Sequence, residues 1–136
     1  MICMNKKTVW LAILLMAFGA ASYAQTSKKP EWKELKVFHS FMSSSFHPAE
    51  EGNFTPLRQK ADSLLIVAKN WQASPIPADF KPVETREALA KLVAQCERVK
   101  KEVDNKASNE VLMKNITAAH DVFHTIVGEC RKTEEH

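Results

Sequence analysis

Two imidazoles and a thiol lie close together in the stretch AAHDVFHTIVGEC, residues 118–130. His120 and His124 are four residues apart, and Cys130 follows six residues later. On an α-helix, side chains four residues apart lie one turn apart on the same side, as two ligands of one metal ion must. Neutral imidazoles suit zinc, copper, nickel or iron. The spacing therefore predicts a pair of transition-metal ligands, provided that a neighbouring element supplies further donors.

A second group of donor side chains occurs earlier in the chain, around the stretch FHPAEEGN. The two groups allow two pockets, and the sequence does not choose between them. One lies at mid-height of the helices and contains His39, Met42, His120 and His124. The other lies near residues 47–55 and contains His47, Glu51 or Glu50, and one of the later histidines. The only catalytic chemistry this offers is an open metal position with Glu50 or Glu51 as base, so no catalytic residue is assigned.

Apolar residues recur at spacings of three and four in four segments, which is the period of an amphipathic helix. The predicted helices cover residues 31–46, 55–71, 83–104 and 108–130. Thr55 and Ser108 are expected to cap the second and fourth helices, and Pro48 is expected to end the first after residue 46. The sequence therefore predicts an all-α fold, an antiparallel up-down-up-down four-helix bundle, in a single domain of residues 25–136.

The rotation of about 100° per residue indicates which donors face the core. His39 lies about 40° from the centre of its apolar stripe, so we expect it to face the core. His120 and His124 lie about 80° and about 120° from their stripe, on one edge of it. Since the first and fourth helices of such a bundle are neighbours that run in opposite directions, the two histidine groups are expected at a similar height.

Cys96 and Cys130, the two cysteines after residue 24, are predicted not to form a disulfide. In a simple helical hairpin they lie roughly 20 Å apart along the axis, whereas a disulfide needs Cα atoms less than about 7 Å apart. We interpret Cys96 as a small core residue. Cys130 stays among the candidate metal ligands. It lies about 9 Å along the axis from His124. This distance suits a buried thiol, or an intermolecular disulfide in a homodimer, better than it suits a ligand of the same ion.

The first 24 residues have the pattern of a secretory signal peptide, with Lys6 and Lys7 before a short apolar run and Ser22-Tyr23-Ala24 before the cleavage site. The run is shorter than the roughly 20 residues of a spanning helix. We therefore predict a periplasmic or secreted protein with no stable membrane span after cleavage. Removing Lys6 and Lys7, in a segment without acidic residues, lowers the formal net charge from +3 to +1. No clustered basic face remains to indicate nucleic-acid binding.

The predicted arrangement resembles the soluble four-helix-bundle cytochromes of the bacterial periplasm, of the b-type and c-prime kinds. They share export, size, a proline-rich crossing between the second and third helices, and a haem-ligating histidine late in the fourth. The resemblance implies axial ligation of haem b by a methionine of the first helix and a histidine of the fourth, here Met42 with His124 or His120. Covalent attachment is excluded because the chain has no CxxCH motif.

The sequence is also similar to small exported bacterial proteins of unknown function. They carry an HPAEEGN-like turn and an HDVFHxIVGxC-like helix, here residues 47–53 and 120–130. This similarity implies no activity, but it joins His47 and Cys130 with the two later histidines in one set of interest.

The leading hypothesis is an exported bundle that binds a transition-metal ion through histidines of its first and fourth helices. The alternatives are a non-covalent haem-binding electron carrier and a metal-free helical interaction or chaperone-like module. An enzyme is the least supported class, because spacing identifies no nucleophile–base pair. The chain has three glycines and no GxGxxG, GxxxxGK or GxSxG motif.

Overall fold

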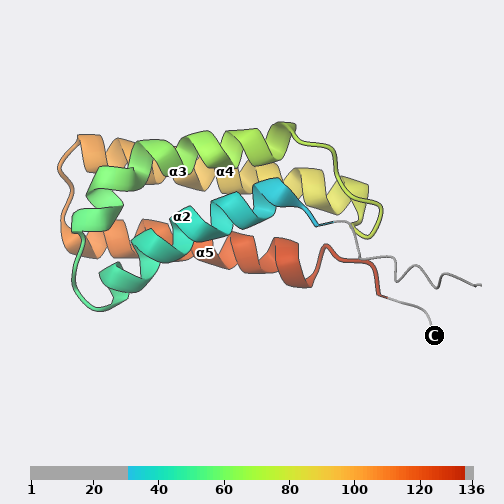
Figure 1. Cartoon of the computed structure of the whole chain (residues 1–136). Helices are drawn as coiled ribbons and strands as arrows, with labels where there is room; N and C mark the ends of the chain where they lie inside the picture. The colour runs from blue at the N-terminus through green and yellow to red at the C-terminus, as the bar shows by residue number, and fades with distance from the viewer. Residues whose placement is uncertain (1–30, 134–136) are drawn as a thin grey trace, which may run out of the picture.

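The computed structural model describes residues 31–133, and this part of the chain is built from helices (Figure 1). The helices are α2 (Lys33–Glu50), α3 (Thr55–Ala73), α4 (Pro82–Asp104) and α5 (Asn109–Gly128). The only β-type pairing between residues 31 and 133 is an isolated bridge that joins Phe80 to Arg131. The predicted all-α class with four helices is therefore confirmed. The predicted signal peptide, residues 1–24, lies outside the described residues.

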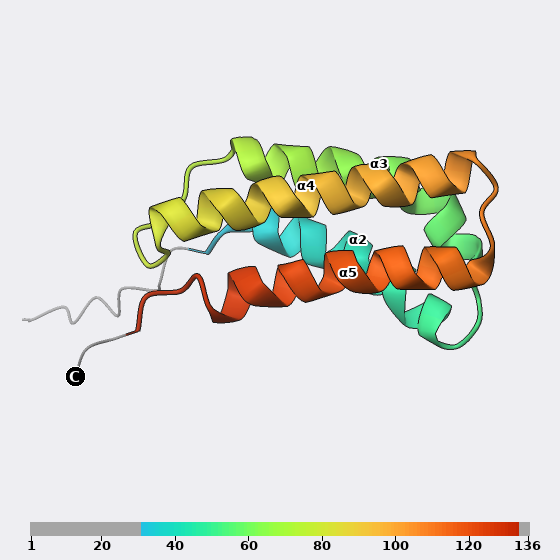
Figure 2. The same cartoon turned by 180° about the vertical axis from the view of Figure 1, so that it is seen from behind.

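The four helices lie side by side, and their connections gather at two ends of the molecule (Figures 1 and 2). α3 packs against α2 and α4, while α5 packs against α4 and α2. The α2–α3 and α4–α5 connections lie at one end, and the α3–α4 connection lies at the other. This packing is compatible with a helical bundle, and it brings the histidines of α2 next to those of α5.

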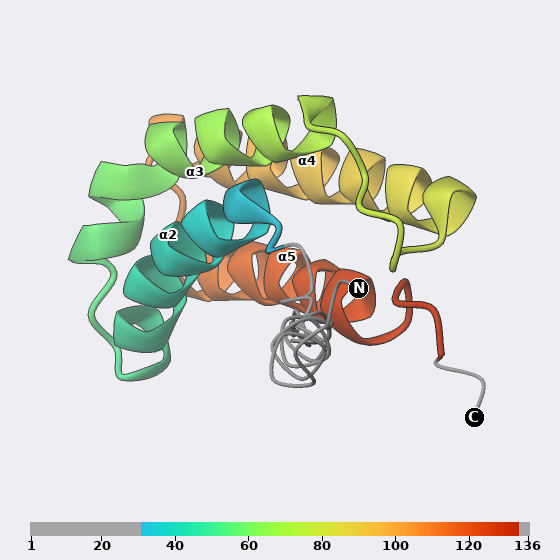
Figure 3. The ribbon, with the colours of Figure 1, turned by 45° about the vertical axis from the view of Figure 1, so that its right-hand side comes forward.

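Every helix contributes to one apolar core. Its largest fully buried apolar side chains are Phe38, Met42, Leu57, Leu64, Trp71, Leu89, Leu92, Val99, Leu112, Ile116 and Ile126. At the α3–α4 end, Trp32 packs edge-on against Trp71 and Phe80, with ring centroids 5.5 and 5.0 Å away. Its Nε1 donates a hydrogen bond to Ser74 Oγ at 2.8 Å. These contacts attach the start of α2 to the α3–α4 connection, beside which it lies in Figure 3.

α2 ends later than predicted, because it continues through Pro48 to Glu50, so the expected stop after Phe46 is wrong. Proline removes a backbone donor and is disfavoured inside a helix. The next residue, Ala49, is only 3 % exposed and packs into the core, which holds the turn in helical form. The chain leaves the helix at Gly52, whose φ of +88° suits glycine. The last turn of α2 is therefore helical where a loop was expected.

The other helix boundaries are close to the predicted ones. Ser108 caps α5 as predicted, since its Oγ accepts a hydrogen bond from the N–H of Val111 at 3.3 Å. Thr55 is the first residue of α3 rather than its cap. α5 ends at Gly128, so Cys130 lies beyond the helix that was predicted to contain it. None of the helices between residues 31 and 133 has the length and apolar character that crossing a membrane requires.

Candidate functional site

The imidazoles of His120 and His124 converge from consecutive turns of α5. Their Nε2 atoms are 3.2 Å apart, and their ring centroids are 4.4 Å apart with the planes inclined by 80°. When both rings are neutral, the Nε2–H of one donates a hydrogen bond to the lone pair of the other. His120 is half-buried, whereas His124 is exposed. The pair therefore presents two nitrogen atoms close together at the protein surface.

Phe46 of α2 packs against one member of this pair, His120. The ring of His120 stacks on that of Phe46, with centroids 4.0 Å apart and planes inclined by 11°. His47 packs edge-on against the same ring at a centroid distance of 5.7 Å. Phe46 is itself only 6 % exposed, so the core holds it in place. One buried aromatic ring thus brings a histidine of α2 close to a histidine of α5.

His47 is in turn held by a carboxylate of its own helix. Its Nδ1 is 3.0 Å from Oε2 of Glu50. The two side chains face each other because α2 stays helical past Pro48, which places residues three apart on one face. Glu51, the acidic residue predicted as a ligand, is exposed at the end of the helix. We refer to the following four side chains as the histidine corner: His47, Glu50, His120 and His124.

Charges from two helices act on His120. Burial lowers the pKa of His120 below its ordinary value, the neighbouring His124 lowers it further, and His47 acts in the same direction. The carboxylates of Asp121 and Glu50 act in the opposite direction. A neutral imidazole has a lone pair for a metal ion. The lowered pKa therefore favours the neutral form of His120, in which one ring nitrogen carries a lone pair.

His39 and Met42 do not belong to the histidine corner, although Phe123, which His39 contacts, also packs edge-on against His124 with centroids 5.7 Å apart. The expectation that His39 faces the core is wrong, because its side chain is exposed and stacks flat on Phe123, with centroids 5.3 Å apart. Met42 is 1 % exposed and belongs to the core. Haem ligation by Met42 and His124 would require both to face one cavity. The structure places the thioether in the interior and the imidazole at the surface.

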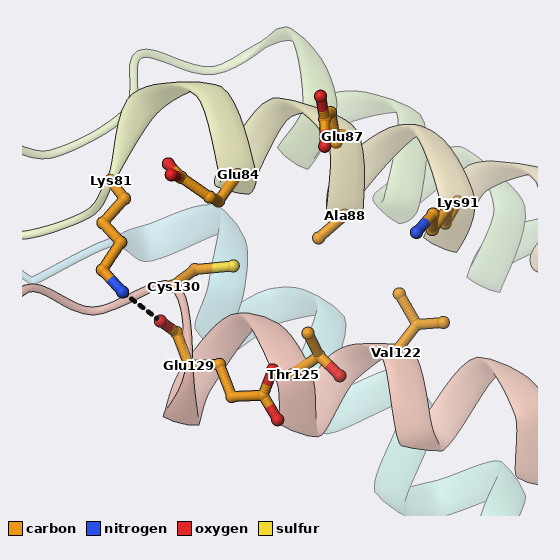
Figure 4. Close-up of a pocket in the computed structure, with 9 residues that line it drawn as sticks. All are labelled: Lys81, Glu84, Glu87, Ala88, Lys91, Val122, Thr125, Glu129 and Cys130. Atoms are coloured by element: carbon orange, nitrogen blue, oxygen red, sulfur yellow. Dashed lines mark hydrogen bonds between the residues drawn. The ribbon is translucent and has the colours of Figure 1, made fainter.

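The cysteines are not part of the histidine corner either. Both are free and buried, which confirms that they do not pair with each other and that Cys96 is a core residue. Cys130 lies between α4 and α5, where it lines a cavity of about 410 Å³ together with Lys81 and Glu84 (Figure 4). Burial raises the pKa of its thiol, and it raises that of Cys96 to about 12. Metal ions bind the thiolate, and the raised pKa makes loss of the thiol proton less favourable at both cysteines.

The described residues do not form a complete metal site. Between residues 31 and 133, no group of three or more His, Cys, Asp or Glu side chains is arranged to hold a metal ion. The structure offers two imidazoles at ligand spacing and a third, that of His47, against the same aromatic ring. Phe46 is the residue that sequence reasoning missed. Its position in the apolar stripe, directly before His47, was the signal that could have identified it.

No protein-family model, no curated protein and no solved structure matches this chain. The resemblance to periplasmic cytochromes and to small exported proteins therefore stays an expectation from the sequence. The functional interpretation rests on the contacts of the histidine corner and on the chemistry that its imidazoles can perform.

Proposed function

We propose that the protein binds a transition-metal ion at the histidine corner, with His120 and His124 as its primary ligands. The observation that supports this best is the 3.2 Å between their Nε2 atoms. Two nitrogen atoms that bind one tetrahedral zinc ion at about 2.0–2.1 Å are about 3.3 Å from each other. Both imidazoles therefore reach a single ion with almost no rearrangement of α5.

Without metal, the two imidazoles make a hydrogen bond with each other, and this bond competes only weakly with metal binding. A typical hydrogen bond of this kind contributes about 0.5–1.5 kcal/mol net, and an exposed partner such as His124 has water as an alternative. The metal needs both rings neutral, and burial of His120 already favours the neutral form. Stacking on Phe46 holds the ring of His120 in place before the ion arrives. These features lower the cost of forming the metal-bound state.

We also propose a topology for the helices that carry the site, a cellular location and a choice of metal ions. We infer that the helices run antiparallel in an up-down-up-down order, because residues 51–54, 74–81 and 105–108 are connections short enough to return each helix beside the last. We infer also that residues 1–24 direct export, so that residues 25–136 bind the ion in the periplasm or outside the cell. Zinc, copper, nickel and iron suit imidazole ligands, and the role is sequestration, sensing or electron transfer.

The test is a metal titration of the protein expressed with its own first 24 residues and without a polyhistidine tag. We expect about one equivalent of zinc, copper or nickel per chain by calorimetry and elemental analysis. Replacing both His120 and His124 by alanine should abolish stoichiometric binding. The matched control is His39→Ala, which removes an exposed imidazole of α2 and should leave binding unchanged. Wild-type binding by the double variant would show that the ligands are misassigned.

Two further outcomes identify the alternative functions. A Soret band after addition of haem to the oxidised protein would indicate a haem carrier, and its absence would dismiss that function. A protein that takes up neither haem nor any of these metals, and whose stability is unaffected by chelators, would be a metal-free interaction module.

A further inference from the structure

The imidazole pair of α5 supplies two of the ligands that one metal ion needs. A zinc ion in a protein is bound tetrahedrally, usually by three or four side chains. Within the described range, residues 31–133, no group of three His, Cys, Asp or Glu side chains is arranged around such an ion. The Nε2 atoms of His120 and His124, 3.2 Å apart, match one edge of the tetrahedron. The other two positions then lie on the opposite edge, which faces away from the pair.

The surface of α5 beside the pair leaves room for another molecule to approach. His124 is exposed and His120 is half-buried. Residues three, four, seven or eight apart lie on one side of a helix, so Thr117 and Gly128 flank the pair along that side. Both are small, and a Cβ atom added to the exposed Gly128 would meet nothing within 4 Å. The line of α5 that carries the two imidazoles therefore has no long side chain directly before or after them.

The charges near the pair favour a cation and permit contact between two copies of the chain. The carboxylates of Asp121 and Glu50 both act electrostatically on His120, and negative charges at this position attract a divalent cation. Without the two lysines of residues 1–24, the formal net charge of +3 falls to +1. Two copies of residues 25–136 therefore repel each other only weakly.

We propose that two copies of this chain share one metal ion, to which each copy contributes His120 and His124. This inference rests on the proposed function. A two-fold axis through the ion places the second pair on the open edge of the tetrahedron, so both copies use the same surface. Four imidazoles then complete the coordination of the ion. Because the ligands come from two chains, binding of the ion and association of the copies are one equilibrium.

A shared ion makes the size of the protein depend on the ratio of metal to chain. At half an equivalent of zinc per chain, every ion finds two imidazole pairs, and the dimer reaches its maximum. Excess zinc provides an ion for each pair, with water in the open positions, so the dimer gives way to monomers by mass action. Uptake then approaches one equivalent per chain. A site completed within one chain has no such maximum.

The test is sedimentation velocity of the full chain, expressed with its own first 24 residues and without a polyhistidine tag, against added zinc. We expect the mass to double at half an equivalent of zinc per chain, and to return to that of the monomer with excess zinc or with a chelator. His124→Ala should abolish the dimer, whereas His39→Ala, which removes an exposed imidazole of α2, should dimerise as the wild type does. Non-reducing electrophoresis should show single chains, because no disulfide is involved.

A bulky side chain beside the pair separates the bridge from metal binding itself. Gly128→Trp leaves both imidazoles in place but obstructs the second copy, so it should lower the dimer fraction and still bind zinc at excess. The matched control is Val111→Trp, at an exposed position near the start of α5, which should dimerise normally. Thermal unfolding of the metal-free variants checks their fold.

Three outcomes would overturn the inference. A wild type that binds zinc through His120 and His124 but stays monomeric at half an equivalent would refute the bridge and leave the proposed function intact. Dimers that persist in His124→Ala, or a mass that keeps growing with excess zinc, would place the contact elsewhere. A wild type that binds no zinc would refute the proposed function as well.

Discussion

Replacing Phe46 by leucine separates its two roles, which are packing in the core and support of the histidines. A hydrophobic exchange of similar size costs at most about 1.5 kcal/mol when the core repacks. Loss of the aromatic contacts with His120 and His47 adds about 0.5–1.5 kcal/mol. We therefore expect the free energy of unfolding of the metal-free protein to fall by about 0.5–3 kcal/mol. Urea denaturation followed by circular dichroism measures this change.

The same substitution should weaken metal binding. Without the stacked ring, His120 has to be ordered when the ion binds, and immobilising one side chain costs about 0.5–1.5 kcal/mol. Since about 1.4 kcal/mol corresponds to a factor of ten, the dissociation constant for zinc should rise about 2- to 10-fold. Calorimetric titration of the folded variant, under conditions where urea curves show it to be native, measures the effect.

Phe38→Leu is the matched control for this prediction. Phe38 is also a buried aromatic residue of α2, but its ring packs on Trp71 and Phe123, with centroids 5.3 and 5.8 Å away. We expect a stability loss of the same order and an unchanged zinc affinity. Wild-type affinity in Phe46→Leu, or equal weakening in both variants, would refute the reasoning that Phe46 preorganises His120.

Three further predictions concern the folded chain as a whole. In the metal-free protein, the free energy of unfolding should fall as the pH falls below about 6.5, because the unfolded chain binds a proton that the folded His120, with its lowered pKa, does not. The loss of stability ends once the pH is below the pKa of His120 in the folded protein. His120→Gln should show a shallower dependence of the unfolding free energy on pH in the same urea experiment. The thiols of Cys96 and Cys130 are buried with raised pKa values, so Ellman's reagent at pH 8 should label them only as fast as the protein unfolds; rapid labelling of the native protein would contradict their burial. Zinc at 100 times its dissociation constant should stabilise the wild type by about 2.7 kcal/mol, and the variant without His120 and His124 should show no such shift.

The helices and the histidine pair could be predicted because both depend on local spacing. The Ser108 cap and the apolar stripe of α5 lie within one continuous segment, and so do His120 and His124. Four residues of separation bring two imidazoles together on any α-helix. The observed 3.2 Å between their Nε2 atoms follows from this spacing and from the ring orientation that Phe46 selects.

The orientation of His39 could not be predicted, because the buried face of α2 is not the face that its apolar residues define. Ser45 and Ala49 are buried, at 0 % and 3 % exposed, whereas Leu35 is only half-buried. The buried residues within α2 are Phe38, Met42, Ser45, Phe46 and Ala49, and the centre of the face that they form lies about 75° from His39 at 100° per residue. A search for large apolar residues overlooks small residues such as Ser45 and Ala49, which are buried where two helices approach closely.

The placement of His47 and Glu50 depends on two opposing effects, the cost of a proline inside α2 and the packing of its last turn in the core. The second effect cannot be read from the local sequence. Proline inside a helix costs about 3 kcal/mol or more, and this favours a stop before Pro48. Packing of Phe46 and Ala49 in the core opposes that cost and keeps the turn helical. If the helix ended at Phe46, His47 would lie in a loop and would not share a face with Glu50.

The position of the proposed site favours one kind of metal binding over another. Structural zinc sites are closed, with four protein ligands, and their domains often unfold without the ion. Here the core consists of apolar side chains from all four helices, and its aromatic contacts at Trp32, Trp71 and Phe80 lie at the opposite end of α2 from His47. The donors stand at the surface, with His47 and His124 exposed. We expect an ion bound there by His120 and His124 to exchange with solvent while the fold persists. The proposed site therefore suits a protein that takes up and releases metal better than one that needs it to fold.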